Sequence, residues 1–140
     1  MIQVLKIPAD VWVNNFSEST HLAVFNEVKS ASLDRIDFAL LAVKDDKPIG
    51  YMTCREFDAE SVYWQYGGVV DEYKKSINAV RVYEAFYNWH SQHYKRCSTY
   101  IENWNVPMLK MAFKIGYRVM GVRNFKNSIL LECLLEFDNG

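Results

Sequence analysis

The sequence has 140 residues, of which 50% are hydrophobic and 15% aromatic. This composition excludes an intrinsically disordered chain and is sufficient for one domain with one core. The formal net charge is −1, with lysines and arginines spread along the chain, so a broad basic surface for nucleic acid is not expected.

The cysteine pattern and the hydropathy indicate in which cellular compartment the protein is expected. Cys54, Cys97 and Cys133 form no CxxC pair, which is typical of reduced thiols and argues against a disulfide framework or a zinc site. The N-terminal residues are not typical of a signal peptide, and no apolar run approaches the roughly 20 residues that a membrane span requires. We therefore expect a cytoplasmic protein that binds neither nucleic acid nor membrane.

The first half of the sequence predicts strands joined by tight turns. A strand is expected at residues 2–7, ending at Pro8, and residues 10–29 are mostly helical in pattern with a break near 14–17. Alternating apolar residues separated by polar turns then predict an antiparallel meander with strands at residues 37–43, 48–57 and 61–70.

Helical periodicity begins in the second half. Residues 76–95 repeat apolar side chains at helical spacing, and a short strand follows at 97–102. A second helix is predicted from an N-cap at Asn105, through Pro107 in its first turn, to a stop at Gly116. Residues 117–123 and 128–137 predict a final hairpin.

The order of these elements predicts the fold class. The connection from the strand at 61–70 through the helix to the strand at 97–102 is expected to be a right-handed crossover between parallel strands. The prediction is an α/β fold in a single domain spanning residues 1–140. Its central sheet is mixed, mostly antiparallel and of six or seven strands, with helices on both faces.

The segment ENWNVPMLKMAFKIGYRVMGV, which begins at Glu102, resembles the GNAT superfamily of N-acetyltransferases. Members commonly have an Asn after the fifth strand, then a helix, then Gly-Phe at the start of the next strand, and Asn105 and Gly116-Tyr117 occupy these places. Members also have a Val, then Pro-Glu-Tyr, then (Arg/Gln)-x-x-Gly-x-(Gly/Ala), which VVDEYKKSINA matches in part from Val69 to Ala79. The resemblance covers residues 36–137 and implies the GNAT fold.

The resemblance also implies a cofactor site. In this family the backbone N–H groups of the loop and of the first helical turn hold the pyrophosphate of acetyl-CoA, an arrangement that the helix dipole favours. The pantetheine arm enters a gap beside the fourth strand, and backbone N–H groups near Val69 and Val70 are expected to stabilise the oxyanion. Acetyl-CoA is thus the implied co-substrate, with binding residues Gly68, Val69, Val70, Lys74, Lys75, Ser76, Ile77, Asn78, Ala79 and Asn105.

Two of these features have an alternative interpretation that needs no cofactor. The Gly67-Gly68 pair predicts a β-bulge that separates the fourth strand from the fifth, or else an ordinary strand end. Asn105 is explained equally well as a helix N-cap.

Two positions depart from the family pattern. Ile77 stands where a Gly is expected, and a β-branched residue disfavours positive φ and narrows access to the backbone. Ala112 stands where members often have a tyrosine that protonates the departing thiolate. Lys74 and Lys75 are expected to compensate with charge.

The remaining chemistry is not assigned by the sequence. Glu56 and Glu60 flank a turn and neither is a clear general base, and His90 and His93 are expected to be packed imidazoles rather than metal ligands. The catalytic residues therefore stay unassigned. The aromatic residues that could line an acceptor pocket or belong to the core are Trp12, Phe16, Trp64, Tyr66, Tyr100 and Trp104.

Two hypotheses follow. The first is an acetyl-CoA-dependent N-acetyltransferase that transfers the acetyl group directly, in a ternary complex, to a primary amine of a small molecule, peptide or protein. The alternative, favoured by Ile77 and Ala112, is a catalytically degenerate GNAT-fold protein that acts as a CoA-binding or protein-interaction module. The apolar run at residues 129–135 is consistent with a homodimer interface and equally with a core strand.

Overall fold

The computed structural model describes residues 1–16, 19–20, 24, 36–74 and 76–137. Half of the expected helix at 10–29 therefore lies outside the described residues. The elements in chain order are β1 (Gln3–Pro8), α1 (Ala9–Asn15), β2 (Phe38–Lys44), β3 (Lys47–Asp58), β4 (Ser61–Val69), η1 (Asp71–Tyr73), α3 (Ile77–Ser91), β5 (Arg96–Glu102), α4 (Val106–Ile115), β6 (Arg118–Phe125) and β7 (Ser128–Glu136).

The strands form a seven-stranded sheet in the order β1-β2-β3-β4-β5-β7-β6. Every neighbouring pair is antiparallel except β4 and β5, which run parallel as the crossover through α3 requires. The predicted mixed, mostly antiparallel sheet is confirmed. None of the helices among the described residues combines the length and the apolar character needed to cross a bilayer.

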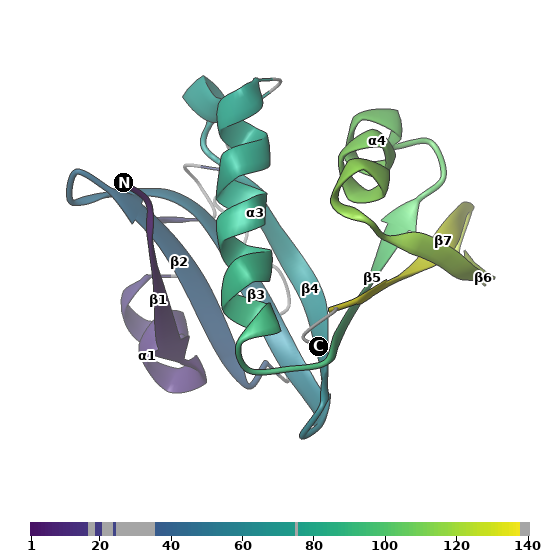
Figure 1. Ribbon diagram of the computed structural model, residues 1–140, viewed down its shortest axis with the longest axis horizontal. Coiled ribbons are helices and arrows are strands. Elements are labelled where there is room, and N and C mark those ends of the chain that lie inside the picture. The colour runs from purple at the N-terminus through teal and green to yellow at the C-terminus, as the bar shows by residue number, and fades with distance from the viewer. Residues whose placement is uncertain (17–18, 21–23, 25–35, 75, 138–140) are drawn as a thin grey trace.

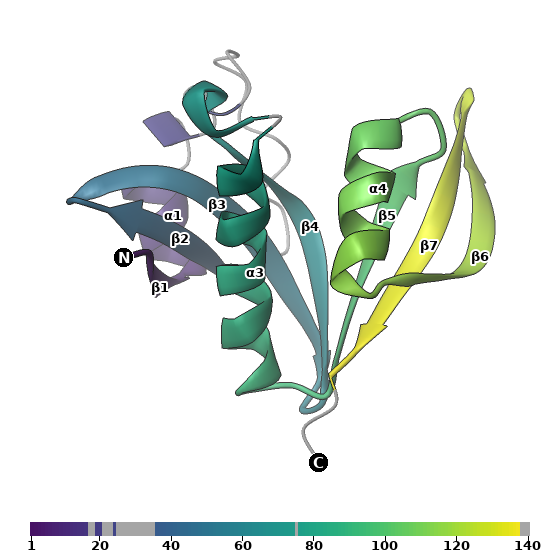
Figure 2. The same cartoon turned by 45° about the horizontal axis from the view of Figure 1, so that its top comes forward.

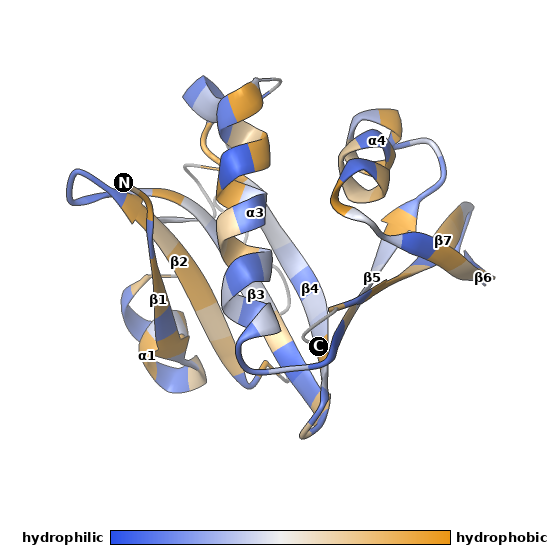
Figure 3. Cartoon of the chain, in the orientation of Figure 1, coloured by the Kyte–Doolittle hydropathy of each residue, from blue (hydrophilic) through white to orange (hydrophobic). Residues whose placement is uncertain are grey.

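Helices cover both faces of the sheet. This arrangement explains why the sequence of β2 is apolar at almost every position (Figure 3). Phe38, Leu40 and Ala42 point into the core beneath α3, whereas Ala39 and Leu41 point into a second core that contains Trp12 of α1. Because β2 lies between two layers of helix, both of its faces are buried. Figures 1 and 2 show α3 in front of the sheet and α1 behind it.

The sheet opens into two wings between β4 and β5 (Figure 2). Only Ser61, Val62 and Tyr63 of β4 pair with β5, at Arg96, Cys97 and Ser98. Beyond these pairs the two strands diverge, so that β1–β4 with α3 form one wing and β5–β7 with α4 form the other.

A β-bulge lies where the two strands separate, but not at the predicted position. Thr53 pairs with Tyr66 and Cys54 pairs with Trp64, so Gln65 is the extra residue of β4. Two threonine hydroxyls satisfy the disturbed backbone, because Thr53 Oγ1 accepts from the N–H of Tyr66 at 3.1 Å and Thr99 Oγ1 donates to the carbonyl of Trp64 at 3.0 Å. The prediction of a bulge at Gly67-Gly68 is wrong, since both glycines pair in register with β3.

Gly67 has a different role, which is to leave room for Trp64. A Cβ at this position would lie 2.5 Å from the backbone carbonyl oxygen of Tyr51 and 2.6 Å from Nε1 of Trp64. Neither group can move aside alone, since the carbonyl belongs to β3 and the indole is buried beneath α3.

His90 is fully buried in the core under α3 and is packed as the sequence analysis expected. Its Nε2 lies 3.1 Å from Sδ of Met52 and 3.9 Å from Sγ of Cys54, and Nδ1 has no hydrogen-bond partner among the described residues. Burial lowers the pKa of His90 to about 3. His93 is exposed and stacks on Trp89, with ring centroids 4.0 Å apart.

The Gly67→Ala variant is expected to lose about 1–3 kcal/mol of unfolding free energy, because the added methyl group overpacks against backbone. Gly121→Ala is a matched control, since its new Cβ would meet only Glu132, the flexible carboxylate at 3.2 Å and Cβ at an ordinary 3.9 Å. Urea unfolding of both variants tests this expectation. An equal loss in the two would show that glycine flexibility, and not the space beside Trp64, is responsible.

The buried imidazole predicts acid sensitivity. The unfolded chain binds a proton at His90 with a pKa of about 6.5, whereas the folded chain excludes it until about pH 3. Above pH 6.5 the imidazole is neutral in both states and does not reduce the unfolding free energy. Between pH 6.5 and about pH 3 only the unfolded chain is protonated, so the unfolding free energy falls by about 1.4 kcal/mol per pH unit. Unfolding measured between pH 6 and pH 4 should show a shallower pH dependence in His90→Gln than in the wild type or in His93→Gln. The same dependence in all three would contradict this assignment.

Candidate active site

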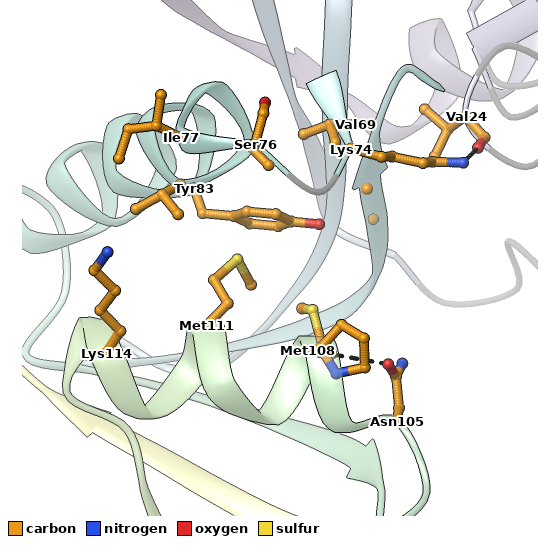
Figure 4. A pocket seen from close by; sticks show the side chains of 15 residues that line it. Val24, Val69, Lys74, Ser76, Ile77, Tyr83, Asn105, Met108, Met111 and Lys114 are labelled. Atoms are coloured by element: carbon orange, nitrogen blue, oxygen red, sulfur yellow. Dashed lines mark hydrogen bonds between the residues drawn. The ribbon is translucent and has the colours of Figure 1, made fainter. Parts of the chain in front are cut away.

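A cleft of about 600 Å³ lies between the two wings. One wall is the end of β4 and the start of α3, and the opposite wall is α4 (Figure 4). The lining residues are Val24, Gly67, Gly68, Val69, Lys74, Ser76, Ile77, Ala79, Val80, Tyr83, Asn105, Pro107, Met108, Met111 and Lys114.

The structure brings most of the sequence-predicted binding residues to this cleft. Those that line it are Gly68, Val69, Lys74, Ser76, Ile77, Ala79 and Asn105. Val70 does not line it, and Asn78 lines a separate hollow that also includes Arg81 and Glu84 of α3. Lys75 lies outside the described residues.

The start of α3 needs no glycine. Ser76 is the N-cap in an extended conformation, and its Oγ accepts from the N–H of Asn78 at 3.2 Å. Ile77 is the first helical residue, and the described residues other than glycine with positive φ are Asp45, Asp46 and Lys126. The predicted conformational conflict at Ile77 is therefore absent, and what remains is its side chain, 56% exposed at the mouth of the cleft.

The cap uses some of the donors that an anion would need. The N–H of Asn78 goes to Ser76 Oγ, and the N–H of Ala79 donates to the carbonyl of Ser76 at 3.1 Å. Among the described residues the N–H of Ile77 has no such acceptor, and the positive end of the α3 dipole adds to its attraction for an anion.

The positive charge near this turn differs from the expectation. The ammonium group of Lys74 donates to Oδ1 of Asp71 at 2.8 Å and to the carbonyl of Val24, so its charge is partly neutralised. Lys114, in the last turn of α4, instead points toward α3 from the opposite wall (Figure 4). The sequence analysis missed Lys114 because a lysine in the last turn of a helix is common for its favourable interaction with the dipole.

Every second backbone N–H group of β4 points toward the cleft. The N–H of Tyr66 points toward Thr53 of β3, and the N–H of Val70 donates to the carbonyl of Ile49 at 2.9 Å. Since successive N–H groups of a strand point to opposite edges, the N–H groups of Gly67 and Val69 point toward the diverging edge. Of the two positions expected to stabilise an oxyanion, Val69 is available and Val70 is not.

The middle of the α4 wall is apolar, and position 112 supplies no acid to the cleft. Met108 and Met111 line the cleft, whereas Ala112 is 1% exposed and belongs to the core. Asn105 Oδ1 accepts from the N–H of Met108 at 3.4 Å, so the N-cap interpretation is confirmed. Asn105 also lines the cleft, and the two interpretations do not exclude each other.

The other candidate residues have structural partners or lie in the core. Glu56 accepts a hydrogen bond from the hydroxyl of Tyr94 at 2.6 Å, and Glu60 pairs with Lys95 and Arg96 at 3.4 and 3.6 Å. Trp12 and Trp64 are core residues, and none of the six aromatic candidates lines the cleft. Tyr66 and Trp104 are exposed, Trp104 by 65%. No group of three or more potential metal ligands occurs within the described parts of the chain.

The fold is similar to those of solved acetyltransferase structures. The ribosomal-protein-S18-alanine N-acetyltransferase from Escherichia coli superimposes with a TM-score of 0.76 at 7% identity, over 100% of this chain and 96% of that one. An N-acetyltransferase from Staphylococcus aureus Mu50 gives 0.73 at 15% identity, over 99% of both chains. A GNAT family acetyltransferase from Elizabethkingia anophelis with acetyl-CoA bound gives 0.69 at 14% identity, over 96% of this chain and 97% of that one.

These similarities confirm the predicted GNAT fold, and at such low identity they show the fold alone. No protein-family model matches the sequence, and no curated protein matches it either. The function must therefore be argued from the cleft itself.

The burial of Ala112 predicts that a tyrosine cannot simply be restored there. Because the methyl group is packed in the core, Ala112→Tyr is expected to overpack it and to cost about 1–3 kcal/mol or more. Thermal or urea unfolding checks this, with Phe113→Tyr as the control at the neighbouring exposed position. A variant at position 112 as stable as the wild type would show that the ring finds space toward the cleft.

Proposed function

Because the chain has the GNAT fold, with a cleft between its diverging wings, we propose that it is an acetyl-CoA-dependent N-acetyltransferase. The acetyl group would pass directly to a primary amine in a ternary complex. The observation that carries this proposal is the convergence, in one cleft, of the unpaired edge of β4, the start of α3 and the lysine of the opposite wall. Structures similar to this one include a GNAT acetyltransferase with acetyl-CoA bound.

The start of α3 suits the pyrophosphate. The N–H of Ile77 and the helix dipole attract an anion, and Lys114 supplies a full positive charge across the cleft. Ser76 and Ala79 line the same end of the cleft with small side chains, which permit close approach to the backbone.

The diverging edge of β4 suits the pantetheine arm. Past Tyr63 no residue of β5 pairs with β4, so the backbone groups of Gly67 and Val69 on that edge can bind the amides of an extended arm as an added strand would. Met108, Met111 and Pro107 provide an apolar surface on the other side of the arm.

The reaction follows from this arrangement. The neutral amine attacks the thioester carbonyl carbon, and the N–H of Val69 is positioned to stabilise the oxyanion. The C–S bond then breaks with its electron pair moving to sulfur, and the proton lost by nitrogen finally balances the charge of the thiolate. No carboxylate lines the cleft among the described residues, so the amine must lose its proton to solvent or to a water molecule.

Calorimetric titration tests the proposal. Acetyl-CoA is expected to bind in the micromolar range and free pantetheine far more weakly, because the phosphates account for much of the affinity. Binding of acetyl-CoA would then justify a screen of primary amines for thiol release. The proposal fails if acetyl-CoA does not bind up to millimolar concentration, or if it binds and no amine releases the thiol, which would favour a CoA-binding module.

Lys114→Gln should weaken acetyl-CoA binding about fivefold at low ionic strength, with a smaller effect at high salt, since its ammonium group is exposed to solvent. Lys110→Gln is the matched control, because Lys110 is also exposed, lies one turn earlier on α4 and does not line the cleft. Equal effects in both variants would indicate long-range attraction rather than a contact between Lys114 and the phosphates.

A further inference from the structure

We infer that the hydroxyl group of Tyr83 donates a hydrogen bond to the sulfur atom that leaves in acetyl transfer, in place of the tyrosine acid that the resemblance leads one to expect at position 112. This inference rests on the proposed function. It identifies a catalytic residue on α3, the wall opposite to the one where the family pattern places it.

Tyr83 reaches into the cleft from α3. Its side chain is 6% exposed, lines the cleft and packs against Trp64 of β4, with ring centroids 5.6 Å apart. Figure 4 shows the ring extending into the space between the walls, with the hydroxyl group beyond Met111. Within the described part of the chain this hydroxyl makes no hydrogen bond, so its proton is available to a ligand.

The depth of Tyr83 fits the sulfur rather than the phosphates. Tyr83 follows Ile77 by six residues along α3, which is about 9 Å at 1.5 Å per residue. The helix runs from the open end of the cleft toward the point where β4 and β5 join (Figure 2). An arm whose phosphates lie at the first turn of α3 therefore extends its thioester toward Tyr83 and the Gly67–Val69 edge.

The other polar side chains of the cleft are committed or lie at the mouth. Ser76 Oγ donates to the carbonyl of Tyr73 at 2.8 Å, Lys74 is paired with Asp71, and Asn105, whose Oδ1 caps α4, lies at the open end where α4 begins (Figure 2). Lys114 points toward α3 from the opposite wall, and its side chain is exposed to solvent. Tyr83 is thus the buried donor in the described lining that is not already used.

The chemistry requires only a hydrogen bond, not a permanent proton transfer. As the C–S bond breaks, its electron pair moves to sulfur, and the O–H of Tyr83 stabilises the negative charge that develops there. Burial raises the pKa of Tyr83 above its usual range, so the phenol keeps its proton throughout. The proton that neutralises the thiolate is the one lost by the amine nitrogen, delivered through solvent.

The experiment needs no acceptor. Affinities for CoA and for desulfo-CoA, which lacks the thiol, are measured by titration calorimetry at pH 6.5 and pH 9 for the wild type, Tyr83→Phe and Tyr87→Phe. A hydrogen bond to the thiolate lowers the pKa of the bound thiol below about 8.5, the value of an ordinary thiol. The ratio of CoA to desulfo-CoA affinity should therefore rise with pH in the wild type, approaching tenfold for each unit of lowering.

Tyr87→Phe is the matched control, because Tyr87 is one turn further along α3, is buried and does not line the cleft. This variant is expected to retain the rise, whereas Tyr83→Phe should lose most of it and still bind desulfo-CoA normally, which shows that the cleft is intact. A rise that persists in Tyr83→Phe, or that is missing in the wild type, overturns the inference and leaves the proposed function standing. Failure of CoA and desulfo-CoA to bind the wild type overturns the proposed function itself.

Discussion

The separation of β4 from β5 is the constraint on which the rest of the structure depends. The two strands share three residue pairs before they diverge, and the bulge at Gln65 lies just beyond the last pair. A continuous parallel ladder would have consumed the edge groups of Gly67 and Val69 and closed the cleft. Thr53 and Thr99 keep the bulge stable, since their hydroxyls bond the N–H of Tyr66 and the carbonyl of Trp64 on either side of Gln65.

The packing of Trp64 connects this separation to the core. Its indole lies against Gly67 on one side and Tyr83 on the other, so one buried side chain fixes both the strand edge and the helix that face the cleft. Glycine at position 67 is therefore a packing requirement, and its place in the cleft lining is a consequence of that requirement. A stable core and an open backbone edge are obtained from the same residues.

Much of this could be predicted from the sequence, because the signals were local. The hairpin at Asp45-Asp46, the Asn105 cap and the stop at Gly116 each depend on a few adjacent residues. The position of the bulge could not, since it depends on the register of β3 against β4 and on threonines from two neighbouring strands. Lys114 and Tyr83 were missed for a similar reason. Each looks ordinary on its own helix, and only the packing of α3 opposite α4 brings both to one cleft.

The departures at Ile77 and Ala112 therefore weigh less against catalysis than the sequence suggested. Ile77 begins α3 with ordinary helical geometry, so the anion site depends on the helix and not on glycine. Ala112 is packed in the core, whereas Tyr83 and Met111 are the side chains that extend between the walls (Figure 4). A hydrogen-bond donor can reach the same region from either wall, because what the leaving sulfur requires is a proton at the right place. Whether the donor belongs to α3 or to α4 makes no difference to this hydrogen bond.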